Sequence, residues 1–537
     1  MKDHYPVVII GGGPVGVALA MELGYRGVEC AIIERETGMH SIPKGQNLTG
    51  RTSEHFYFWD VLPQIRAARA MPQGYPIGGV SCYKNLMNEY WSQSFQADNG
   101  LEDYYYQTGE RLPQYDMENV LRAKLATISE VDFQLGWSVT AIKQDGAGVR
   151  ITMNEEGGSG QQVIEADYAV GCDGGRSTIR DLIGVKRVGT DFNQLMVLAV
   201  FRSKELHEVL EKYPHGSVYN ALHPDLEGAW KFFGRIDVGE GWFFHTPVPA
   251  DTTQENFDFE GLIQDAAGFK CKIEFDNVLF WNLRIAVAEN FQDGRIFIGG
   301  DAAHSHPPYG GLGVNNGFED IANLGWKLAA KCLGWGGDAL LDSYTEERRP
   351  IFRDTGEDFI AGWIKADREW LKRHSPEKDG PEGFREAWEQ RNTGGAPLRK
   401  TYEPNYEGSS VVMGGPGGKI SAHGTHTIEA RTGHHLPPRK LSAGGDIYEA
   451  MPIGAALRGT GFTLIALDAE ESAIAAFQQV AGKLNIPLAV IRDSFDGGRE
   501  EYERRLILMR PDQYVVWVGD RQPDDLDGIM ARVAGRT

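Results

Sequence analysis

The stretch Val7-Val8-Ile9-Ile10-Gly11-Gly12-Gly13-Pro14-Val15-Gly16 decides the fold of this chain. Its four apolar residues predict a buried parallel strand, and residues 17–23 after the glycines predict a helix. A second strand over residues 31–33 ends on Glu34, followed by Arg35. This order of strand, GxGxxG, helix, strand and acid is typical of a dinucleotide site.

Each glycine of the motif has a separate physical reason. Gly11 permits the tight turn, Gly13 lets the backbone reach a pyrophosphate, and Gly16 lets the helix pack closely on the strand. Free N–H groups at the helix N-terminus then face the phosphates, and Glu34 can accept hydrogen bonds from a ribose. The alternative is a glycine-rich turn in an α/β protein that binds no nucleotide.

A second glycine cluster follows the apolar residues 168–170. Asp173, Gly174 and Gly175 form the turn, and Ser177 is placed to cap the next helix. Taken alone, this segment could be an ordinary Asp-Gly turn.

The third cluster extends from the predicted strand at residues 295–298 to Gly317. Gly300 and Asp301 end the strand, and prolines and glycines lead to a helix that begins near residue 318. His304 and His306 raise the question of a metal, but no third ligand stands at suitable spacing. We therefore predict no metal site and assign both histidines structural or supporting roles.

Composition excludes several classes of protein. The chain has 537 residues, of which 41 % are hydrophobic and 24 % charged, so a disordered or fibrous chain is excluded. The net charge of −21 argues against nucleic acid or an anionic membrane as a partner. Glycine is unusually abundant, with 67 residues, which predicts either many loops or repeated close approach of the backbone to a ligand.

Cysteine usage predicts the compartment. The five cysteines are scattered without CxxC spacing, which argues against disulfides and zinc. Neither a signal peptide nor a membrane span is expected, because no apolar run is long enough. The prediction is a cytoplasmic protein.

With its three glycine clusters in this order, the chain resembles the single-component FAD-dependent aromatic hydroxylases, the para-hydroxybenzoate hydroxylase superfamily. That resemblance implies an α/β fold with a Rossmann-like FAD-binding domain of the glutathione-reductase type. It also implies an inserted antiparallel-sheet substrate domain and a thioredoxin-like C-terminal domain. The C-terminal domain has no cysteine, so we expect an interface or stability role there rather than thiol chemistry.

The resemblance assigns FAD contacts residue by residue. Lys44 stands where the family usually has arginine, and Arg51-Thr52 fits the family pattern. Leu312 and Gly313 would approach the flavin ring with their backbone, and the family glutamine of this loop is missing. The implied cofactor-binding residues are Gly11, Gly13, Pro14, Val15, Gly16, Glu34, Arg35, Lys44, Arg51, Gln114, Asp173, Gly174, Gly300, Asp301, Pro308, Gly311, Leu312, Gly313, Val314 and Asn315, with Arg122 a further candidate.

The FAD elements lie far apart in the sequence, so the flavin domain must be discontinuous. We assign residues 1–80, 111–185 and 275–355 to it, and residues 81–110 and 186–274 to the substrate domain. Residues 356–400 form a helical connection, and residues 401–537 form the C-terminal domain. Aromatic residues in the second insertion either fill a core or line an apolar pocket.

By resemblance, the reaction uses NADPH or NADH and O2, and a flavin C4a-hydroperoxide hydroxylates a phenol-like aromatic substrate. The chain has no second strand–GxGxxG–helix unit, so the nicotinamide cofactor would bind transiently in a shared cleft. A base or a hydrogen-bond partner that draws the proton from the substrate hydroxyl would activate the ring, and Gln46 could serve only as a hydrogen-bond partner. The candidates are Gln46, Tyr104, Tyr115 and His306, which the sequence does not rank.

Two alternatives remain open at this stage. A flavin monooxygenase on the same fold could carry out Baeyer–Villiger insertion or epoxidation, and a non-catalytic binding protein could retain the fold. Halogenation is not expected, because the Trp-x-Trp-x-Ile-Pro signature is absent. The oligomeric state is also open, with a homodimer as the common outcome.

Overall fold

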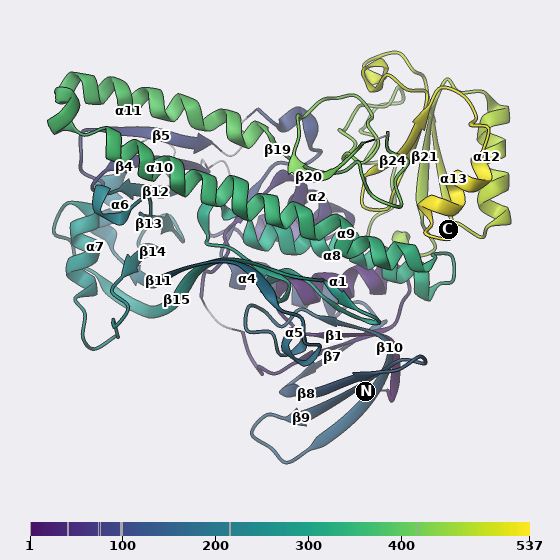
Figure 1. Ribbon diagram of the computed structural model, residues 1–537, viewed down its shortest axis with the longest axis horizontal. Coiled ribbons are helices and arrows are strands. Elements are labelled where there is room, and N and C mark those ends of the chain that lie inside the picture. Colours follow the sequence, from purple (N-terminus) through teal and green to yellow (C-terminus); the bar gives the residue numbers. More distant parts are fainter. Residues whose placement is uncertain are drawn as a thin grey trace.

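The protein is described here from a computed structural model that covers residues 2–537 except 40–41, 73–74, 76, 97–99, 214–215 and 416. Two eight-stranded sheets and a smaller four-stranded sheet organise the chain (Figure 1). No helix in this described part of the chain combines the length and the apolar character needed to cross a membrane.

The first sheet has a parallel centre. Its strands run in the order β16 (Gln292–Asp293), β17 (Ile296–Ile298), β10 (Gln161–Gly171), β1 (His4–Ile10), β2 (Cys30–Glu34) and β7 (Val131–Leu135), while β8 (Trp137–Gln144) and β9 (Val149–Glu155) extend it from β10. Val7, Val8 and Ile9 are completely buried, as expected for a strand covered on both faces. The carboxyl ends of β1, β10 and β17 therefore meet at one edge of this sheet.

Helices cover this sheet and share its core. α1 packs against α8, and α8 against α9 (Figure 1). Thr49 caps α2, its hydroxyl accepting a hydrogen bond from the Thr52 N–H. The helices of this part are α1 (Pro14–Tyr25), α2 (Gly50–Phe58), α3 (Leu62–Ala67), α4 (Gln114–Leu125), α5 (Thr178–Leu182), α8 (Gly313–Cys332) and α9 (Asp338–Asp354).

The second sheet is largely antiparallel. Its order is β18 (His304–Ser305), β15 (Glu274–Ala288), β11 (Arg187–Arg202), β14 (Gly241–Val248), β13 (Trp230–Arg235), β12 (Val218–Leu222), β4 (Gly78–Tyr83) and β5 (Trp91–Gln96). Only β12 and β4 pair in parallel among its described strands. β15 belongs to this sheet although most of its residues fall in the predicted flavin domain, because one long strand crosses between the two regions. The predicted domain limits remain a prediction.

Four helices accompany the second sheet. α6 (Lys204–Leu210) and α7 (Phe259–Ala267) flank it, and the pair α10 (Ala361–Arg373) and α11 (Pro376–Lys400) spans its other side (Figure 1). A π-helical segment, Thr355–Ile360, joins α9 to α10, and Gly380 breaks the helical geometry of α11.

The C-terminal region contains the third sheet. Strands β22 (Leu488–Asp493), β21 (Phe462–Leu467), β23 (Leu506–Met509) and β24 (Val515–Gly519) lie in that order, with α12 (Glu471–Lys483) and α13 (Leu526–Val533) packed against each other. Two further small pairs are β3 (Asn47–Leu48) with β6 (Glu110–Arg111) and β19 (Tyr402–Tyr406) with β20 (Ile420–His423). The predicted fold class is thus confirmed.

Candidate functional site

The glycine motif forms a tight turn between β1 and α1. Gly11 has a φ of +109°, and a Cβ atom placed on it would lie 2.4 Å from the carbonyl oxygen of Cys172. A Cβ atom on Gly16 would lie 2.0 Å from the carbonyl oxygen of Gly11. Only glycine therefore permits this close packing of strand, turn and helix.

Gly13 differs from its neighbours because it faces open space. Among the described residues, no heavy atom beyond its chain neighbours lies within 4 Å of a Cβ atom placed there. Pro14 begins α1, whose first turn has no side-chain cap. Val15 packs against Gly300 and Gly317, which brings the N-terminus of α1 beside that of α8. Two helix N-termini thus converge at the sheet edge, a favourable arrangement for an anion such as a pyrophosphate.

The predicted ribose-binding acid lies beside the turn. Glu34 accepts hydrogen bonds from the N–H groups of Gly12, at 2.6 Å, and Glu36, at 2.8 Å. Arg35 is exposed and lies 3.5 Å from the Glu36 carboxylate. Arg122, the further candidate from the family pattern, donates a hydrogen bond to the Gly12 carbonyl oxygen at 2.7 Å. It therefore contacts the glycine turn 11–16, which together with the strand ends at residues 171–175 and 299–301 we call the cofactor cradle.

At the same edge of the first sheet, the second glycine cluster contains a carboxylate that can accept a further hydrogen bond. Asp173 accepts a hydrogen bond from the Ile179 N–H at 3.1 Å through Oδ2, whereas its buried Oδ1 has no partner among the described residues. Gly174 has a φ of +80° and, like Gly175, faces open space. The segment is an Asp-Gly turn, and it is also part of the cradle.

The third cluster contributes Asp301 and the entry to α8. Asp301 is an exposed residue, yet the surrounding protein limits the hydration of its carboxyl and raises its pKa, while His304 and Lys44 act in the opposite direction. Lys44 is therefore close enough to Asp301 for their charges to interact. Gly300, which precedes Asp301, has a φ of +59°.

Two segments meet next to this cluster. The Gly45 N–H donates to Gln114 Oε1 at 3.3 Å, and Gln114 Nε2 donates to Glu118 at 2.7 Å. Val314 lies beside Gly45, so predicted cofactor residues from three remote segments come together here.

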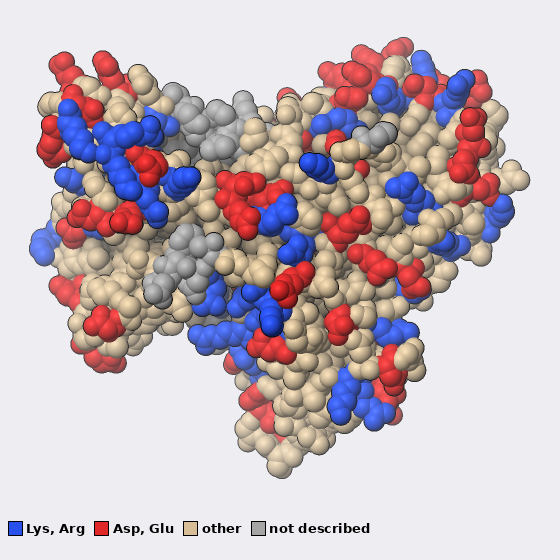
Figure 2. All heavy atoms as spheres, viewed as in Figure 1, with Lys and Arg blue, Asp and Glu red and all other residues tan. Residues whose placement is uncertain are grey.

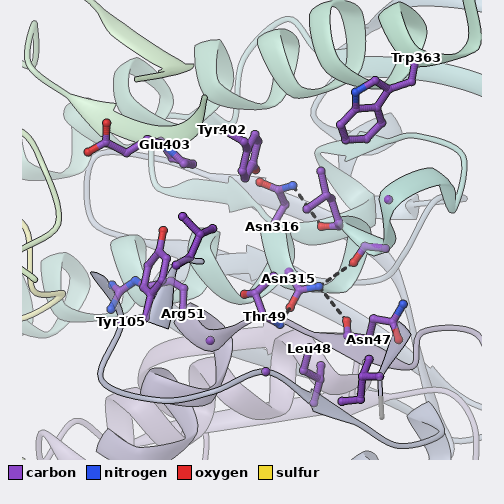
Figure 3. Close-up of a pocket in the computed structure, with 18 of the residues that line it drawn as sticks. Asn47, Leu48, Thr49, Arg51, Tyr105, Asn315, Asn316, Trp363, Tyr402 and Glu403 are labelled. Atoms are coloured by element: carbon purple, nitrogen blue, oxygen red, sulfur yellow. Dashed lines mark hydrogen bonds between the residues drawn. The ribbon is translucent and has the colours of Figure 1, made fainter. Parts of the chain in front are cut away.

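The Asn315 side chain connects the glycine loop, residues 310–313, to residues 47–52 by hydrogen bonds. Its Oδ1 accepts from the Thr49 N–H at 2.9 Å and the Thr52 hydroxyl at 2.6 Å. Its Nδ2 donates to the carbonyl oxygens of Asn47, at 2.9 Å, and Gly311, at 2.7 Å (Figure 3). The side chain is fully occupied by the protein, so its task is to hold Gly311 and Asn47 at the wall of the pocket described below.

These observations fit an FAD molecule. Within the described part of the chain, Gly13, Gly174 and Gly175 face open space, Asp173 Oδ1 has no partner, and two helix N-termini converge. A dinucleotide needs backbone donors and room at such positions. The individual cofactor contacts remain predictions.

Arg51 binds several protein groups. Its guanidinium donates to Glu54 Oε2 at 2.9 Å, to Gln513 Oε1 at 2.9 Å and to the Asp512 carbonyl oxygen at 2.6 Å, and it lies 3.1 Å from Glu319. It ties α2 to the C-terminal region, which no motif in the sequence indicates. A contact between Arg51 and the cofactor stays a prediction.

A pocket of about 810 Å3 opens between the glycine loop, the second sheet, α10–α11 and the C-terminal region. On one side it is bounded by Asn47, Gly311 and Leu312. Its aromatic walls come from β13, from α10 and from the segments around residues 105 and 402 (Figure 3). These aromatic residues are Trp230, Phe232, Trp363, Trp370, Tyr104, Tyr105, Tyr106, Tyr402 and Tyr514.

The four predicted catalytic residues are not brought together. Tyr104 lines the pocket, and Gln46 is buried next to pocket-lining Asn47, with neither amide atom paired among the described residues. Tyr115 lies on α4, where burial raises its pKa to about 12. His306 contacts the Pro307 carbonyl oxygen, and burial lowers its pKa to about 4. Neither Tyr115 nor His306 is among the residues that line the pocket.

His304 belongs to a buried network. Its Nε2 lies 2.5 Å from Asp320 Oδ2, and Arg348 donates to Asp320 Oδ1 at 2.8 Å. Among the described residues, no group of three or more His, Cys, Asp or Glu side chains is arranged to hold a metal ion.

Sequence reasoning missed a large part of the pocket. Trp363 and Trp370 come from α10, and His426, His435 and Tyr514 come from the C-terminal region. No motif marks them, because each reaches the pocket only through the packing of remote segments.

Known proteins resemble the chain over its whole length. The family described as "FAD binding domain" matches residues 4–357, and the family "Aromatic-ring hydroxylase, C-terminal" matches residues 429–537. Tetracenomycin A2 monooxygenase-dioxygenase of Streptomyces glaucescens is 27 % identical, over 99 % of this chain and 98 % of that protein. Rifampicin monooxygenase of Streptomyces venezuelae is 26 % identical, over 98 % of each.

A solved structure extends the likeness to three dimensions. RebC soaked with chromopyrrolic acid, with bound 7-carboxy-K252c, superposes with a TM-score of 0.85 at 26 % identity and covers 100 % of both chains. The cradle, the adjoining pocket and both family matches lead to one assignment: this chain belongs to the FAD-dependent aromatic-ring hydroxylases.

Proposed function

We propose that the protein hydroxylates a polycyclic, phenol-like aromatic substrate with O2 and with NADPH or NADH. One oxygen atom enters the ring in place of an aryl hydrogen, and the other leaves as water. The two electrons come from the nicotinamide cofactor. When bound, FAD supplies the redox chemistry and the activation of O2.

One observation carries the proposal: the pocket joins the cofactor cradle to aromatic walls. Gly311, Leu312 and Asn47 from the cradle side line the same cavity as Trp230 and Trp363. Its volume of about 810 Å3 lies in the upper part of the range of about 300–1,000 Å3 that small-molecule sites span. Aromatic rings on several of its walls favour a polycyclic substrate over a single ring, and relatives named as polyketide hydroxylases support this.

The chain's own residues have three tasks in this reaction. Trp230, Phe232 and Trp363 offer flat apolar surfaces against which an aromatic ring packs and excludes water. Gln46 adjoins the pocket-lining Asn47, and its buried amide has no partner among the described residues, which suits it to hold a hydroxyl or a carbonyl group in place. Tyr104, the predicted candidate on the pocket wall, can exchange a hydrogen bond with the substrate hydroxyl.

The test is a substrate screen on the FAD-loaded protein. NADPH and NADH oxidation is followed with monocyclic phenols and hydroxybenzoates in one set, and hydroxynaphthalenes and hydroxyanthraquinones in the other. We expect stimulation chiefly by the second set, with product NMR showing one aryl C–H replaced by hydroxyl. Stimulation by none of them contradicts the proposal, and a ring-expanded ester or an epoxide supports the alternative flavin chemistries instead.

A further inference from the structure

One end of the pocket is polar and is built partly by the C-terminal region. Tyr105 belongs to the loop after β5, whereas His426, Thr427 and His435 belong to the segment that leads into the last sheet, and all four line the cavity. We call these four residues the polar recess. Figure 3 shows Tyr105 beside Arg51 on one side of the pocket and Trp363 on the opposite side.

The recess is held by contacts between segments that are remote in sequence. The Tyr105 hydroxyl is hydrogen-bonded to His426 Nε2 at 3.2 Å, and the Tyr105 ring lies 5.3 Å from the His435 ring. His435 Nε2 lies 2.9 Å from Glu54 on α2 and 2.9 Å from the Tyr448 hydroxyl. Burial raises the pKa of Tyr105 far above its ordinary value, so this side chain is a neutral phenol that both donates and accepts.

The recess also contains unused hydrogen-bonding capacity. Thr427 Oγ1 is buried and has no partner among the described residues. A buried hydroxyl without a partner costs free energy that a ligand can recover. Thr427 therefore supplies a second donor and acceptor beside the Tyr105–His426 pair.

The charges around the recess determine which polar group of a ligand can bind there. Glu54 and Glu319 flank the cavity, and Arg51 with neighbouring histidines holds the pKa of each carboxyl below its usual value. Both are therefore carboxylates, and Arg51 pairs with each of them. A ligand carboxylate here would be repelled by like charge, whereas a neutral hydroxyl would not.

We infer that the C-terminal region is part of the substrate site, and that the polar recess of Tyr105, His426, Thr427 and His435 binds a neutral hydroxyl group at one end of the aromatic substrate. This inference rests on the proposed function and gives it a specificity rule. It also gives the C-terminal region a ligand-binding role in addition to the interface role expected for it.

The test uses the FAD-loaded protein without a nicotinamide cofactor and three probes of one shape. 1-Hydroxypyrene, pyrene and pyrene-1-carboxylate are titrated by fluorescence at pH 7. The variants are Tyr105→Phe and Thr427→Val, each of which removes one hydroxyl at nearly constant volume. The matched control is Tyr90→Phe, whose hydroxyl donates to the Pro381 carbonyl oxygen at 3.4 Å and which is not among the pocket residues.

The expected order of affinity is 1-hydroxypyrene, then pyrene, then pyrene-1-carboxylate. Each recess variant should reduce the preference for 1-hydroxypyrene over pyrene roughly two- to tenfold, the value of one hydrogen bond. Pyrene itself should bind the variants as it binds the unchanged protein, which also shows that they are folded. The Tyr90→Phe control should keep the full preference.

Two results would overturn the inference. If both recess variants keep the preference, or if the carboxylate probe binds most tightly, the recess does not bind a neutral hydroxyl. In that case pyrene binding still supports an aromatic pocket, so the proposed function survives. If none of the three probes binds, the polycyclic substrate class fails together with the recess.

Discussion

The cofactor cradle is made chiefly of main chain, whereas the adjoining pocket is made of side chains. In the cradle, Gly11 and Gly16 allow backbone atoms to approach within distances that no Cβ atom would permit. In the pocket, rings such as Trp230, Trp363 and Tyr402 come from three unrelated segments. A backbone site needs particular residues in a short stretch, but a side-chain site needs only a fold that brings suitable surfaces together.

A substitution at the closest backbone contact of the cradle should therefore have the largest effect on FAD binding and stability. In Gly16→Ala, the new methyl group would meet the Gly11 carbonyl oxygen, so strand and helix must separate. We expect the protein to be isolated without bound FAD and with a markedly lower melting temperature, measured by flavin absorbance and circular dichroism. A variant that keeps stoichiometric FAD contradicts this description of the turn.

The pocket side depends instead on the attachment of the C-terminal region. Arg510 donates to Glu347 on α9 at 2.7 Å and to Asp512 at 2.5 Å, and all three side chains are buried. Arg510→Met removes the positive charge that pairs with the buried carboxylates of Glu347 and Asp512. The substitution should therefore lower the free energy of unfolding by about 3–5 kcal/mol.

Urea denaturation measures this loss. The matched control is Arg492→Met, which breaks an exposed ion pair with Glu471 of 3.2 Å and should cost less than about 1 kcal/mol. Equal effects of the two substitutions would show that the buried charges do not secure this region.

The second sheet, which forms one wall of the pocket, should respond to acid through His245. Burial lowers the pKa of this β14 residue to about 4, from 6.5 in the unfolded chain. Between these values the unfolded chain binds more protons, so stability falls as the pH decreases from 6.5 to 4. The loss should reach about 2 kcal/mol at pH 5.

His245→Phe removes the titrating group and should flatten this part of the stability–pH curve. Unfolding midpoints at pH 7 and pH 5 give the comparison. An unchanged pH dependence in the variant would show that other groups cause the acid sensitivity.

The smallest predicted effect again concerns the cradle. Gly13→Ala introduces a methyl group that meets no atom of the described residues within 4 Å apart from its chain neighbours, so the fold should be unaffected. The same methyl group occupies the space assigned to the FAD pyrophosphate and should weaken FAD binding roughly tenfold, about 1.4 kcal/mol. Gly146→Ala is the control, because its Cβ atom also meets nothing and lies on the distant β8–β9 turn. Equal FAD affinity in both variants would place the cofactor elsewhere.

The same contrast explains what the sequence could predict. The strand, turn and helix at residues 7–23 were readable because apolar residues and glycines stand at spacings that one local geometry requires. The hydrogen-bonded cluster of Asn47, Asn315 and Gly311 is harder to predict, because only folding brings these residues together. Some of the abundant glycines, such as Gly11 and Gly16, are required by close packing of the backbone within the protein itself.

The pocket was largely beyond prediction. The motif around Arg51 predicts a cofactor contact, which stays a prediction, but it gives no sign of the contacts with Glu54, Glu319 and Gln513. The sequence does not distinguish Tyr105 from the candidate Tyr104, because adjacent tyrosines in a loop carry no periodic signal of which hydroxyl meets a partner. His426, the hydrogen-bond partner of Tyr105, lies 321 residues away in the sequence, so no local pattern connects the two.

Oxygen labelling of a product tests the central claim most directly. The FAD-loaded protein is incubated with NADPH or NADH, a polycyclic phenol from the screen and isotopically heavy O2, and the product is analysed by mass spectrometry and NMR. We predict one labelled hydroxyl on the aromatic ring and one nicotinamide cofactor oxidised per product. Label found only in water and hydrogen peroxide, with the phenol unchanged, would contradict the account.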